Sequence, residues 1–178
     1  MDFDNLDDFH VEKLEKKKKK KNGNRKGKRV EREIVHKLNE RFKHLNESFS
    51  RSVGSGNRYG QVKNMPKHAK ETLTGDLCCP QGFKFVIESK GGYSGIDLNS
   101  ILDGGNSEVD KFLEQVTEDS TRANKMPMLI WKRDRKPWLC FLKTNQINGD
   151  YDYKITYRDW TCILLDSLLN LDDKFFFD

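Results

Sequence analysis

The sequence predicts an α/β fold in which a central mixed β-sheet is flanked by α-helices. Three observations support this prediction: segments with apolar residues at helical spacing, strand-like apolar runs between them, and their order along the chain, α–β–β–α–β–β–(β)–α. Alternation of this kind is typical of one sheet with helices on its faces. The chain has 178 residues, which is enough for one domain with a sizeable core.

The first helix is predicted to begin at about residue 27. Val30, Ile34 and Leu38 recur at the three-to-four-residue spacing of a buried helical stripe. The helix is followed by residues 50–75, a long segment with many glycine, serine and basic residues. A segment of this length predicts either a functional loop or a tolerated surface insertion.

Two neighbouring antiparallel strands are predicted next, at residues 76–79 and 83–90, joined by the turn PQG. In the second strand, FKFVIESK, the apolar residues Phe83, Phe85 and Ile87 alternate with Lys84, Val86 and Glu88. This is the period of a strand with one face in the core. The same period places Glu88 and Lys90 on one face.

The second half of the chain predicts a helix, further strands and a last helix. Residues 107–120 carry apolar side chains at helical spacing, whereas MLIWKR, PWLCFLK and YDYKITY are typical of strands. WTCILLDSLLNL is predicted as the last helix, and DDKFFFD as an irregular tail. The ranges expected for these later elements are strands at 128–133, 137–143 and 151–157, a helix at 160–171 and the tail at 172–178.

Positive charge is concentrated near the N-terminus. The formal net charge is +5, but residues 13–29 alone hold eleven Lys or Arg and one Glu, a local charge of +10 (11 − 1). We therefore predict a basic, disordered arm at 1–24 and a single domain at 25–178, with a core at 25–145 and a C-terminal extension at 146–178. Such an arm attracts polyanions without reading sequence, or only keeps the protein soluble.

The composition also predicts the compartment. No apolar run approaches the roughly 20 residues that span a membrane, and the start, MDFDNLDDF, is too acidic for a secretory signal. The four cysteines show no CxxC spacing, so we expect free thiols rather than a zinc site. We therefore expect a cytoplasmic protein with no membrane partner.

Three charged residues, Asp76, Glu88 and Lys90, form a candidate metal-dependent site. If the two strands are neighbours, the two carboxylates approach each other and need a cation between them. Mg²⁺ takes oxygen ligands of this kind, polarises a phosphoryl oxygen and lowers the pKa of a bound water. Glu31, at the edge of the helical stripe, either completes the metal shell or reaches solvent. The alternative for Glu88 is a strand-end salt bridge with a lysine.

Four short blocks occur in an order that narrows the interpretation: RKGKRVERE at 25–33, FSRSVGSG at 49–56, GDL at 75–77 and VIESK at 86–90. Together they resemble the PD-(D/E)xK nuclease superfamily and, within it, the archaeal-type Holliday junction resolvases. In that family Arg-Lys-Gly and Glu-Arg-Glu open a helix, Arg-Ser-x-Gly-Ser follows it, and an aspartate precedes Glu-x-Lys. The size and the additional segments resemble a viral or phage member.

The resemblance implies a restriction-endonuclease-like core and a metal-dependent, structure-selective DNA endonuclease. Such an enzyme cleaves four-way junctions and other branched DNA by phosphodiester hydrolysis, in DNA recombination and repair. The cofactor implied is Mg²⁺, with Mn²⁺ able to substitute. The partners implied are branched or duplex DNA and a second copy of the chain in a homodimer. A viral member would act in the cytoplasm of its host.

Roles for individual residues also follow from the resemblance. It implies metal ligands at Asp76 and Glu88, an essential acid and further ligand at Glu31, and Lys90 acting on the attacking water. The residues expected to bind DNA are Lys26, Arg32, Arg51, Ser52 and Arg58. Gln115, on the helix after the site, is either a contact for substrate or metal-bound water, or a solvated helix residue.

Two other functions stay open. One is another nuclease of the same superfamily, of nicking or restriction type, which would cut linear duplex as fast as a junction. The other is a non-catalytic basic DNA-binding protein that uses the lysine-rich arm, and it would have no Mn²⁺ site that depends on Glu88.

Overall fold

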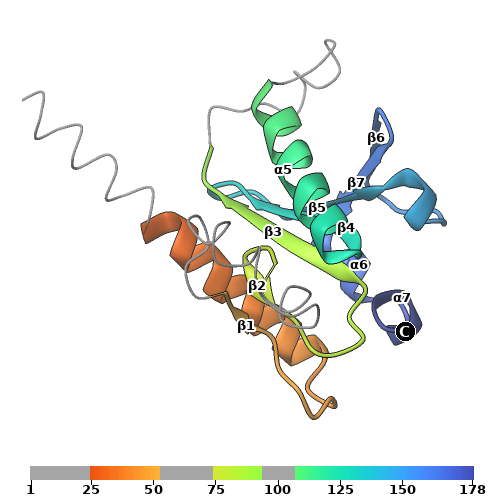
Figure 1. The fold of residues 1–178 in the computed structure, drawn as a ribbon. Helices are drawn as coiled ribbons and strands as arrows, with labels where there is room; N and C mark the ends of the chain where they lie inside the picture. The colour runs from red at the N-terminus through yellow and green to blue at the C-terminus, as the bar shows by residue number, and fades with distance from the viewer. Residues whose placement is uncertain (1–24, 53–73, 94–106) are drawn as a thin grey trace, which may run out of the picture.

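The computed structural model describes residues 25–52, 74–93 and 107–178 (Figure 1). At its centre is a five-stranded sheet with the strand order β3-β4-β5-β7-β6. β3 and β4 run parallel, and the other neighbours are antiparallel, so the sheet is mixed, as predicted. Two short strands, β1 and β2, form a separate antiparallel pair.

The strands are β1 Ser50–Arg51, β2 Leu77–Cys78, β3 Phe85–Gly91, β4 Met126–Lys132, β5 Trp138–Lys143, β6 Lys154–Tyr157 and β7 Trp160–Leu164. The helices are a long one at 25–41, α5 Ser107–Ala123, a 3₁₀ turn at Thr144–Gln146, α6 Leu165–Leu169 and α7 Asp173–Phe176. Within the described ranges, no helix combines the length and apolarity needed to cross a membrane. None of the four cysteines forms a disulfide.

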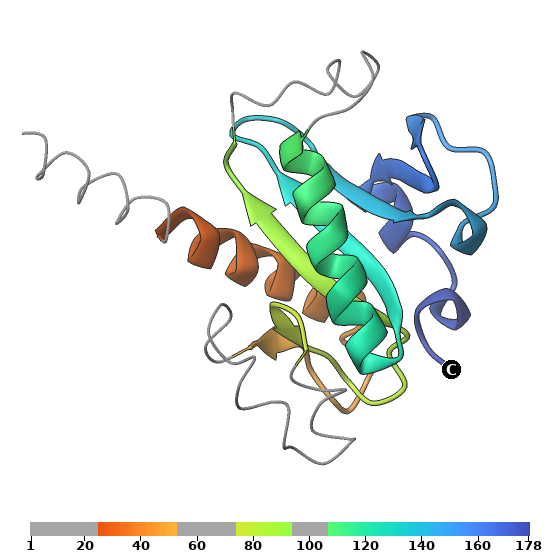
Figure 2. The ribbon, with the colours of Figure 1, turned by 45° about the horizontal axis from the view of Figure 1, so that its top comes forward.

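Helices cover both faces of the sheet (Figure 2). On one face, Val109, Leu113 and Val116 of α5 form a buried cluster with Leu129 and Trp131 of β4. This arrangement follows from the helical spacing of the apolar residues in α5, which gives the helix one apolar side. The predicted α/β fold with helices flanking a central sheet is therefore confirmed.

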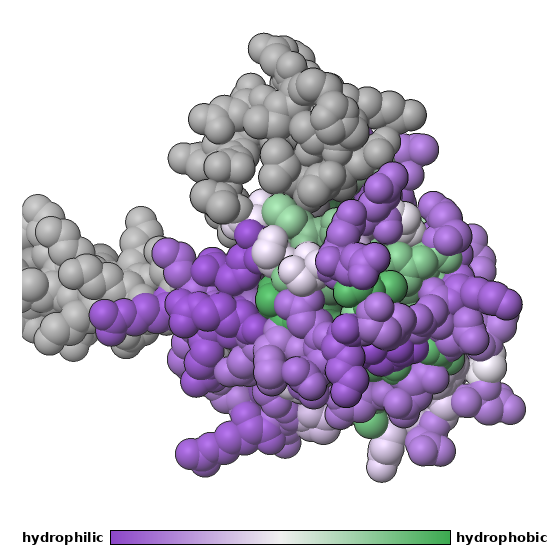
Figure 3. All heavy atoms as spheres, turned by 90° about the horizontal axis from the view of Figure 1, so that it is seen from below, coloured by the Kyte–Doolittle hydropathy of each residue, from purple (hydrophilic) through white to green (hydrophobic). Residues whose placement is uncertain are grey.

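The opposite face is covered by the helix at 25–41. Val30, Ile34 and Leu38 of this helix share a second buried cluster with Phe85 and Ile87 of β3. The predicted stripe is thus the buried side of the helix. The face of the molecule seen in Figure 3 is mostly hydrophilic, with strongly hydrophilic side chains gathered at the first described turns of this helix.

Two glycines let neighbouring segments approach β3 closely. A Cβ atom on Gly91 would lie 2.6 Å from Cγ2 of Val30, so the helix crosses the end of β3 only where no side chain intervenes. Gly75 has a φ of +86°, and a Cβ there would lie 2.7 Å from the carbonyl oxygen of Ile87. Both glycines therefore bring a segment that bears a carboxylate up to β3.

The predicted pairing of residues 76–79 with 83–90 is wrong. β2 pairs with β1 instead, with Arg51 opposite Leu77. The 76–79 segment meets β3 at Asp76, whose backbone N–H donates to the carbonyl of Ile87 at 3.0 Å. The left-handed Gly75 turns the chain at this point, so it touches β3 without running alongside it.

The predicted helix at 160–171 is also wrong in its first half. Trp160–Leu164 forms β7, and only Leu165–Leu169 is helical. Four consecutive residues, 160–163, are buried, because helices or side chains cover both faces of the sheet there. A run that is apolar on both faces has no strand period and is easily taken for a buried helix.

The C-terminal residues are more regular than predicted. The tail contains α7, whose N-cap Asp172 accepts a hydrogen bond from N–H of Lys174 at 2.9 Å. Phe176 is 1% exposed and belongs to the core cluster under the first helix. The strand expected at 151–157 is present but shorter, as β6. The segment after residue 145 thus supplies two strands and part of the core.

Candidate active site

β3 forms one edge of the five-stranded sheet, and the predicted catalytic residues come together along it. Glu88 and Lys90 lie on β3, Asp76 directly precedes β2, and Glu31 lies on the helix at 25–41. Burial raises the pKa of Asp76, and the charge of Glu31 raises it further while Lys90 lowers it. Asp76 therefore lies within electrostatic reach of the other three residues, which come from two further segments.

Glu88 is a buried acid on the face of β3 that α5 covers. Its side chain is 3% exposed, and Oε1 accepts hydrogen bonds from Nζ of Lys90 at 2.6 Å and from Nε2 of Gln115 at 2.7 Å. Burial and then the charge of Asp76 raise the pKa of Glu88 to about 8, against the opposing effect of Lys90. Without a further cation, burial and the neighbouring Asp76 therefore favour the protonated form of this carboxyl more than water does.

The ammonium of Lys90 is fixed by three neighbours. Nζ donates to Oε1 of Glu88 and, at 2.8 Å, to Oε1 of Gln115. It also lies 5.2 Å from the ring centroid of Phe112, within the range of a cation–π interaction. The predicted alternation of β3 is thus confirmed, since Glu88 and Lys90 share a face and meet the same residue of α5.

Asp76 lies against the free edge of β3. Its Oδ2 accepts hydrogen bonds from both N–H and Oγ of Ser89, each at 2.8 Å. Burial is the main cause of its raised pKa, and the two hydrogen bonds from Ser89 lower that pKa in part. Together with the bond from its own N–H to Ile87, these contacts fix the carboxylate beside Glu88 without a regular strand pairing.

Glu31 is paired with Arg51. Oε2 of Glu31 accepts from Nε of Arg51 at 2.6 Å and lies 2.5 Å from Nη2. Glu31 is 8% exposed, whereas the Arg51 side chain is 30% exposed. Because β1 pairs with β2, Arg51 is held next to the segment that bears Asp76. The structure thus brings Glu31 of the first sequence block and Arg51 of the second to the edge of β3 that bears the candidate site.

A divalent cation fits the two carboxylates nearest Lys90. Oε2 of Glu88 and Oδ1 of Asp76 accept no hydrogen bond from the described residues, and the pKa values of both groups are raised. Two such oxygens suit Mg²⁺, which retains several waters. In the described part of the chain, no three His, Cys, Asp or Glu side chains are gathered as a metal site. Glu31 as a third ligand stays a prediction.

The residues predicted to bind DNA have different surroundings. Arg32 is exposed and forms no ion pair with the described residues. Lys26 is exposed and pairs with Asp134 at 2.9 Å. Ser52 is buried, and its N–H donates to the carbonyl of Asp76 at 2.8 Å. Arg58 lies outside the described residues.

Two residues of α5 extend the site. Gln115 was a weak candidate in the sequence, but its amide bridges Glu88 and Lys90. Asp119 has no sequence signal of its own. It lies one turn further along α5 and pairs with Arg122 at 2.6 Å. Burial raises the pKa of Asp119, and the charge of Asp76 adds to this effect after the opposing charge of Arg122. The i, i+4 spacing from Gln115 is the pattern that identifies it.

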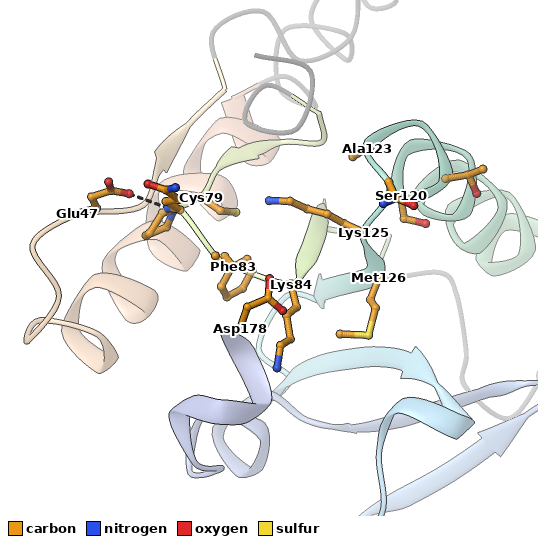
Figure 4. Close-up of a pocket in the computed structure, with 14 residues that line it drawn as sticks. Glu47, Cys79, Phe83, Lys84, Ser120, Ala123, Lys125, Met126 and Asp178 are labelled. Atoms are coloured by element: carbon orange, nitrogen blue, oxygen red, sulfur yellow. Dashed lines mark hydrogen bonds between the residues drawn. The ribbon is translucent and has the colours of Figure 1, made fainter. Parts of the chain in front are cut away.

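A pocket of about 1080 Å³ opens at the other end of β3 (Figure 4). Lys84 and Lys125 lie on its wall, and Glu47 accepts a hydrogen bond from N–H of Gln81 at 2.7 Å. None of the predicted catalytic residues lines this pocket. The candidate chemistry therefore belongs to the edge of β3 and not to this cavity.

Comparison with known proteins agrees with this geometry. A family model described as “Phage putative PDDEXK endonuclease” matches residues 22–169, which is most of the chain. Neither the curated proteins nor the solved structures gave a match. The matched range contains the helix at 25–41, the whole five-stranded sheet, and the Asp76 and Glu88-x-Lys90 set. The core is thus restriction-endonuclease-like, and the chain belongs to this family of phage PDDEXK endonucleases.

Proposed function

We propose that this protein is a Mg²⁺-dependent endonuclease that hydrolyses phosphodiester bonds in four-way junctions and other branched DNA. Membership of the endonuclease family supports the nuclease activity. The observation that carries the choice of substrate is the Glu31–Arg51 pair. It joins one residue from each of the two blocks similar to junction resolvases, next to the edge that bears Asp76, Glu88 and Lys90.

In this proposal Asp76 and Glu88 hold the metal ion. Bound Mg²⁺ would polarise the phosphoryl group and lower the pKa of a coordinated water. Lys90, whose ammonium is fixed by Glu88 and Gln115, orients the attacking water and offsets the charge that develops on the phosphate. The water oxygen bonds to phosphorus as the bond between phosphorus and the sugar oxygen breaks. The water gives up a proton, and the sugar oxygen takes one up.

Arg51 has a second task in this proposal. Glu31 engages Nε and Nη2 of its guanidinium, and a guanidinium carries five N–H donors in a planar fork. Because the side chain is 30% exposed, its other N–H groups are available to a phosphate oxygen. Glu31 thus fixes the orientation of an arginine that contacts the DNA backbone.

A homodimer and a viral setting complete the proposal. Two copies related by a twofold axis present two identical sites, which matches the two equivalent strands of a four-way junction. The description of the family as phage proteins supports action in the cytoplasm of a host cell. Light scattering on the purified protein, free and bound to a junction, tests whether two copies bind one junction.

The direct test is cleavage of an end-labelled four-way junction in Mg²⁺, beside a linear duplex of the same sequence. We expect the junction to be cut faster, Mn²⁺ to replace Mg²⁺, and EDTA to abolish the reaction. Asp76→Asn should bind the junction but not cut it. Equal cleavage by the parent and Asp76→Asn, or no cleavage by either with any divalent cation, would contradict the proposal.

The same experiment separates the alternatives. Cleavage of the linear duplex as fast as the junction identifies another type of PD-(D/E)xK nuclease. A non-catalytic DNA-binding protein is identified by calorimetry with Mn²⁺, in which the parent and Glu88→Gln would show no difference.

A further inference from the structure

A basic surface lies directly beyond the catalytic edge. Residues 25–33 hold five Lys or Arg and two Glu, and residues 132–136 hold four Lys or Arg and one Asp, so each segment has a net charge of +3. Their sum, +6 (3 + 3), exceeds the +5 of the whole chain. The exposed cations of this surface are Arg25, Lys26, Lys28, Arg29, Arg32, Arg135 and Lys136.

The two segments are joined in space, although about 100 residues separate them. Nζ of Lys26 donates to Oδ2 of Asp134 at 2.9 Å. The pKa of Asp134 is lowered by Lys26 first and also by Arg29. The turn between β4 and β5 lies at the same end of the sheet as the start of the helix (Figures 1 and 2). The ion pair makes one continuous surface from the two.

This surface starts within two residues of Lys90. N–H of Gly92 donates to the carbonyl of Lys132 at 2.9 Å, and Gly91 lies against Val30 of the helix. An α-helix rises about 1.5 Å per residue, so residues 25–32 extend over about 10 Å. That length corresponds to about three nucleotides at about 3.4 Å per nucleotide of one strand.

The cations here differ from most others on the described surface. Arg32, Arg135 and Lys136 form no ion pair with described acids, whereas Lys26 pairs with Asp134 and Arg29 with Glu33. Elsewhere many Lys and Arg side chains are neutralised by an acid; the pairs are Lys37–Asp166, Arg41–Asp173, Lys111–Glu108 and Lys143–Asp159. Unneutralised positive charge beside a phosphodiester site is suited to the phosphates that flank the cleaved bond.

We propose that the β4–β5 turn, residues 133–136, is a DNA-contact element. With the first described turns of the helix at 25–41, it holds the phosphate backbone next to the scissile bond. The position of the scissile bond in this inference rests on the proposed function. The contact between the turn and DNA does not. Because phosphates are the same in every sequence, the turn adds affinity without sequence preference.

The test compares two double variants that lose the same charge. Arg135→Asn/Lys136→Gln neutralises the turn, and Asn suits the φ of +58° at position 135. Lys154→Gln/Lys174→Gln is the control, because both residues are exposed, with Lys154 on the opposite edge strand β6 and Lys174 on α7. Binding to a labelled four-way junction is measured without divalent cations at several salt concentrations.

We expect the turn variant to bind about tenfold more weakly, and its plot of log K against log salt to be shallower by about one to two units. The control should follow the parent. The single-turnover cleavage rate at saturating protein should stay within about twofold of the parent, because two phosphate contacts supply affinity rather than chemistry. Equal salt slopes for the two double variants, or a lost saturating rate in the turn variant, would overturn the proposal.

A third variant tests the sign of the effect. Asp134→Asn removes the acid of the turn, and the exposed ion pair with Lys26 that it breaks contributes little stability. We expect tighter DNA binding, whereas weaker binding would count against the proposal.

The outcomes also separate this inference from the proposed function. If the parent cuts no DNA with any metal, but the turn variant still loses salt-dependent binding, the nuclease proposal fails and the contact stands. If junctions are cut and the turn variant binds like the control, the contact fails and the nuclease proposal stands. A parent that binds no DNA overturns both.

Discussion

Glu31 and Arg51 form an ion pair in which both Nε and Nη2 of the guanidinium meet one carboxylate oxygen, at 2.6 and 2.5 Å. The pair links the helix at 25–41 to β1, and through β1 to the segment that bears Asp76. Since Glu31 is 8% exposed, Arg51 supplies the cation that compensates for the burial of its carboxylate. The pair therefore contributes to stability as well as to the site.

Arg51→Met should lower the free energy of unfolding by about 1–3 kcal/mol, less than for a fully buried pair because Arg51 is partly exposed. The loss arises because Glu31 is left buried without a cation. Glu31→Gln/Arg51→Met should recover much of this stability. Urea denaturation of the single and double variants measures the difference, and equal destabilisation in both would show that the unpaired carboxylate is not the cause.

Glu88 should make the metal-free protein less stable as pH rises. Its pKa is about 8 in the folded protein and 4.5 in the unfolded chain. Between these values the unfolded chain releases the proton and the folded protein keeps it, so the unfolded state gains stability with pH. The charge of Asp76 raises the pKa of Glu88 and that of Lys90 lowers it. Both residues are retained when Glu88 alone is replaced.

Glu88→Gln removes this titration. In EDTA, the variant should show a flatter dependence of unfolding free energy on pH and should be the more stable protein near pH 8. Mg²⁺ should stabilise the parent in this range but not the variant. Urea denaturation across this pH range measures both effects, and parallel curves for parent and variant would contradict the assignment.

Gln115 should act on the rate rather than on binding. Its amide holds Glu88 and Lys90 together, and substitutions of residues that orient such groups typically lower activity about 10–100-fold. Gln115→Met should therefore lower the saturating single-turnover rate by this factor, while junction affinity in EDTA stays unchanged. Glu114→Gln, the exposed neighbour on α5, is the matched control and should keep the parent rate.

Gly91→Ala should separate the helix at 25–41 from β3. The new Cβ would lie 2.6 Å from Cγ2 of Val30, and overpacking of this kind costs about 1–3 kcal/mol. Val30→Ala/Gly91→Ala should be more stable than the sum of the two single changes predicts, by more than about 0.5 kcal/mol. Additive effects in thermal or urea unfolding would show that the two side chains do not collide.

The elements with a clear period could be predicted from the sequence. The first helix has one apolar stripe, and β3 places Phe85 and Ile87 in the core and Glu88 and Lys90 at the site, although the four residues 85–88 are all buried. β7 could not be predicted in this way, because it is buried on both faces. The α7 segment was missed since Asp172, Asp173 and Lys174 surround its aromatic residues with charge, and only tertiary contacts show that Phe176 is buried.

The candidate site was predictable as a set of residues but not as an arrangement. The order of the blocks identified Glu31, Asp76, Glu88 and Lys90, whose proximity depends on two glycines and a turn. The ion pair of Glu31 with Arg51 joins residues 20 apart, and no local pattern encodes it. Asp119 was missed because nothing in the sequence except its i, i+4 spacing from Gln115 sets it apart on α5.

Asp76 also has a consequence for solubility. β3 is an edge strand, and an edge N–H that lacks a partner can pair with the edge of another chain. Oδ2 of Asp76 occupies the N–H of Ser89, so this carboxylate of the candidate site also blocks the template for aggregation. An inactive enzyme made as Asp76→Asn keeps an oxygen at that position. Asp76→Ala leaves the edge open, and we expect it to self-associate.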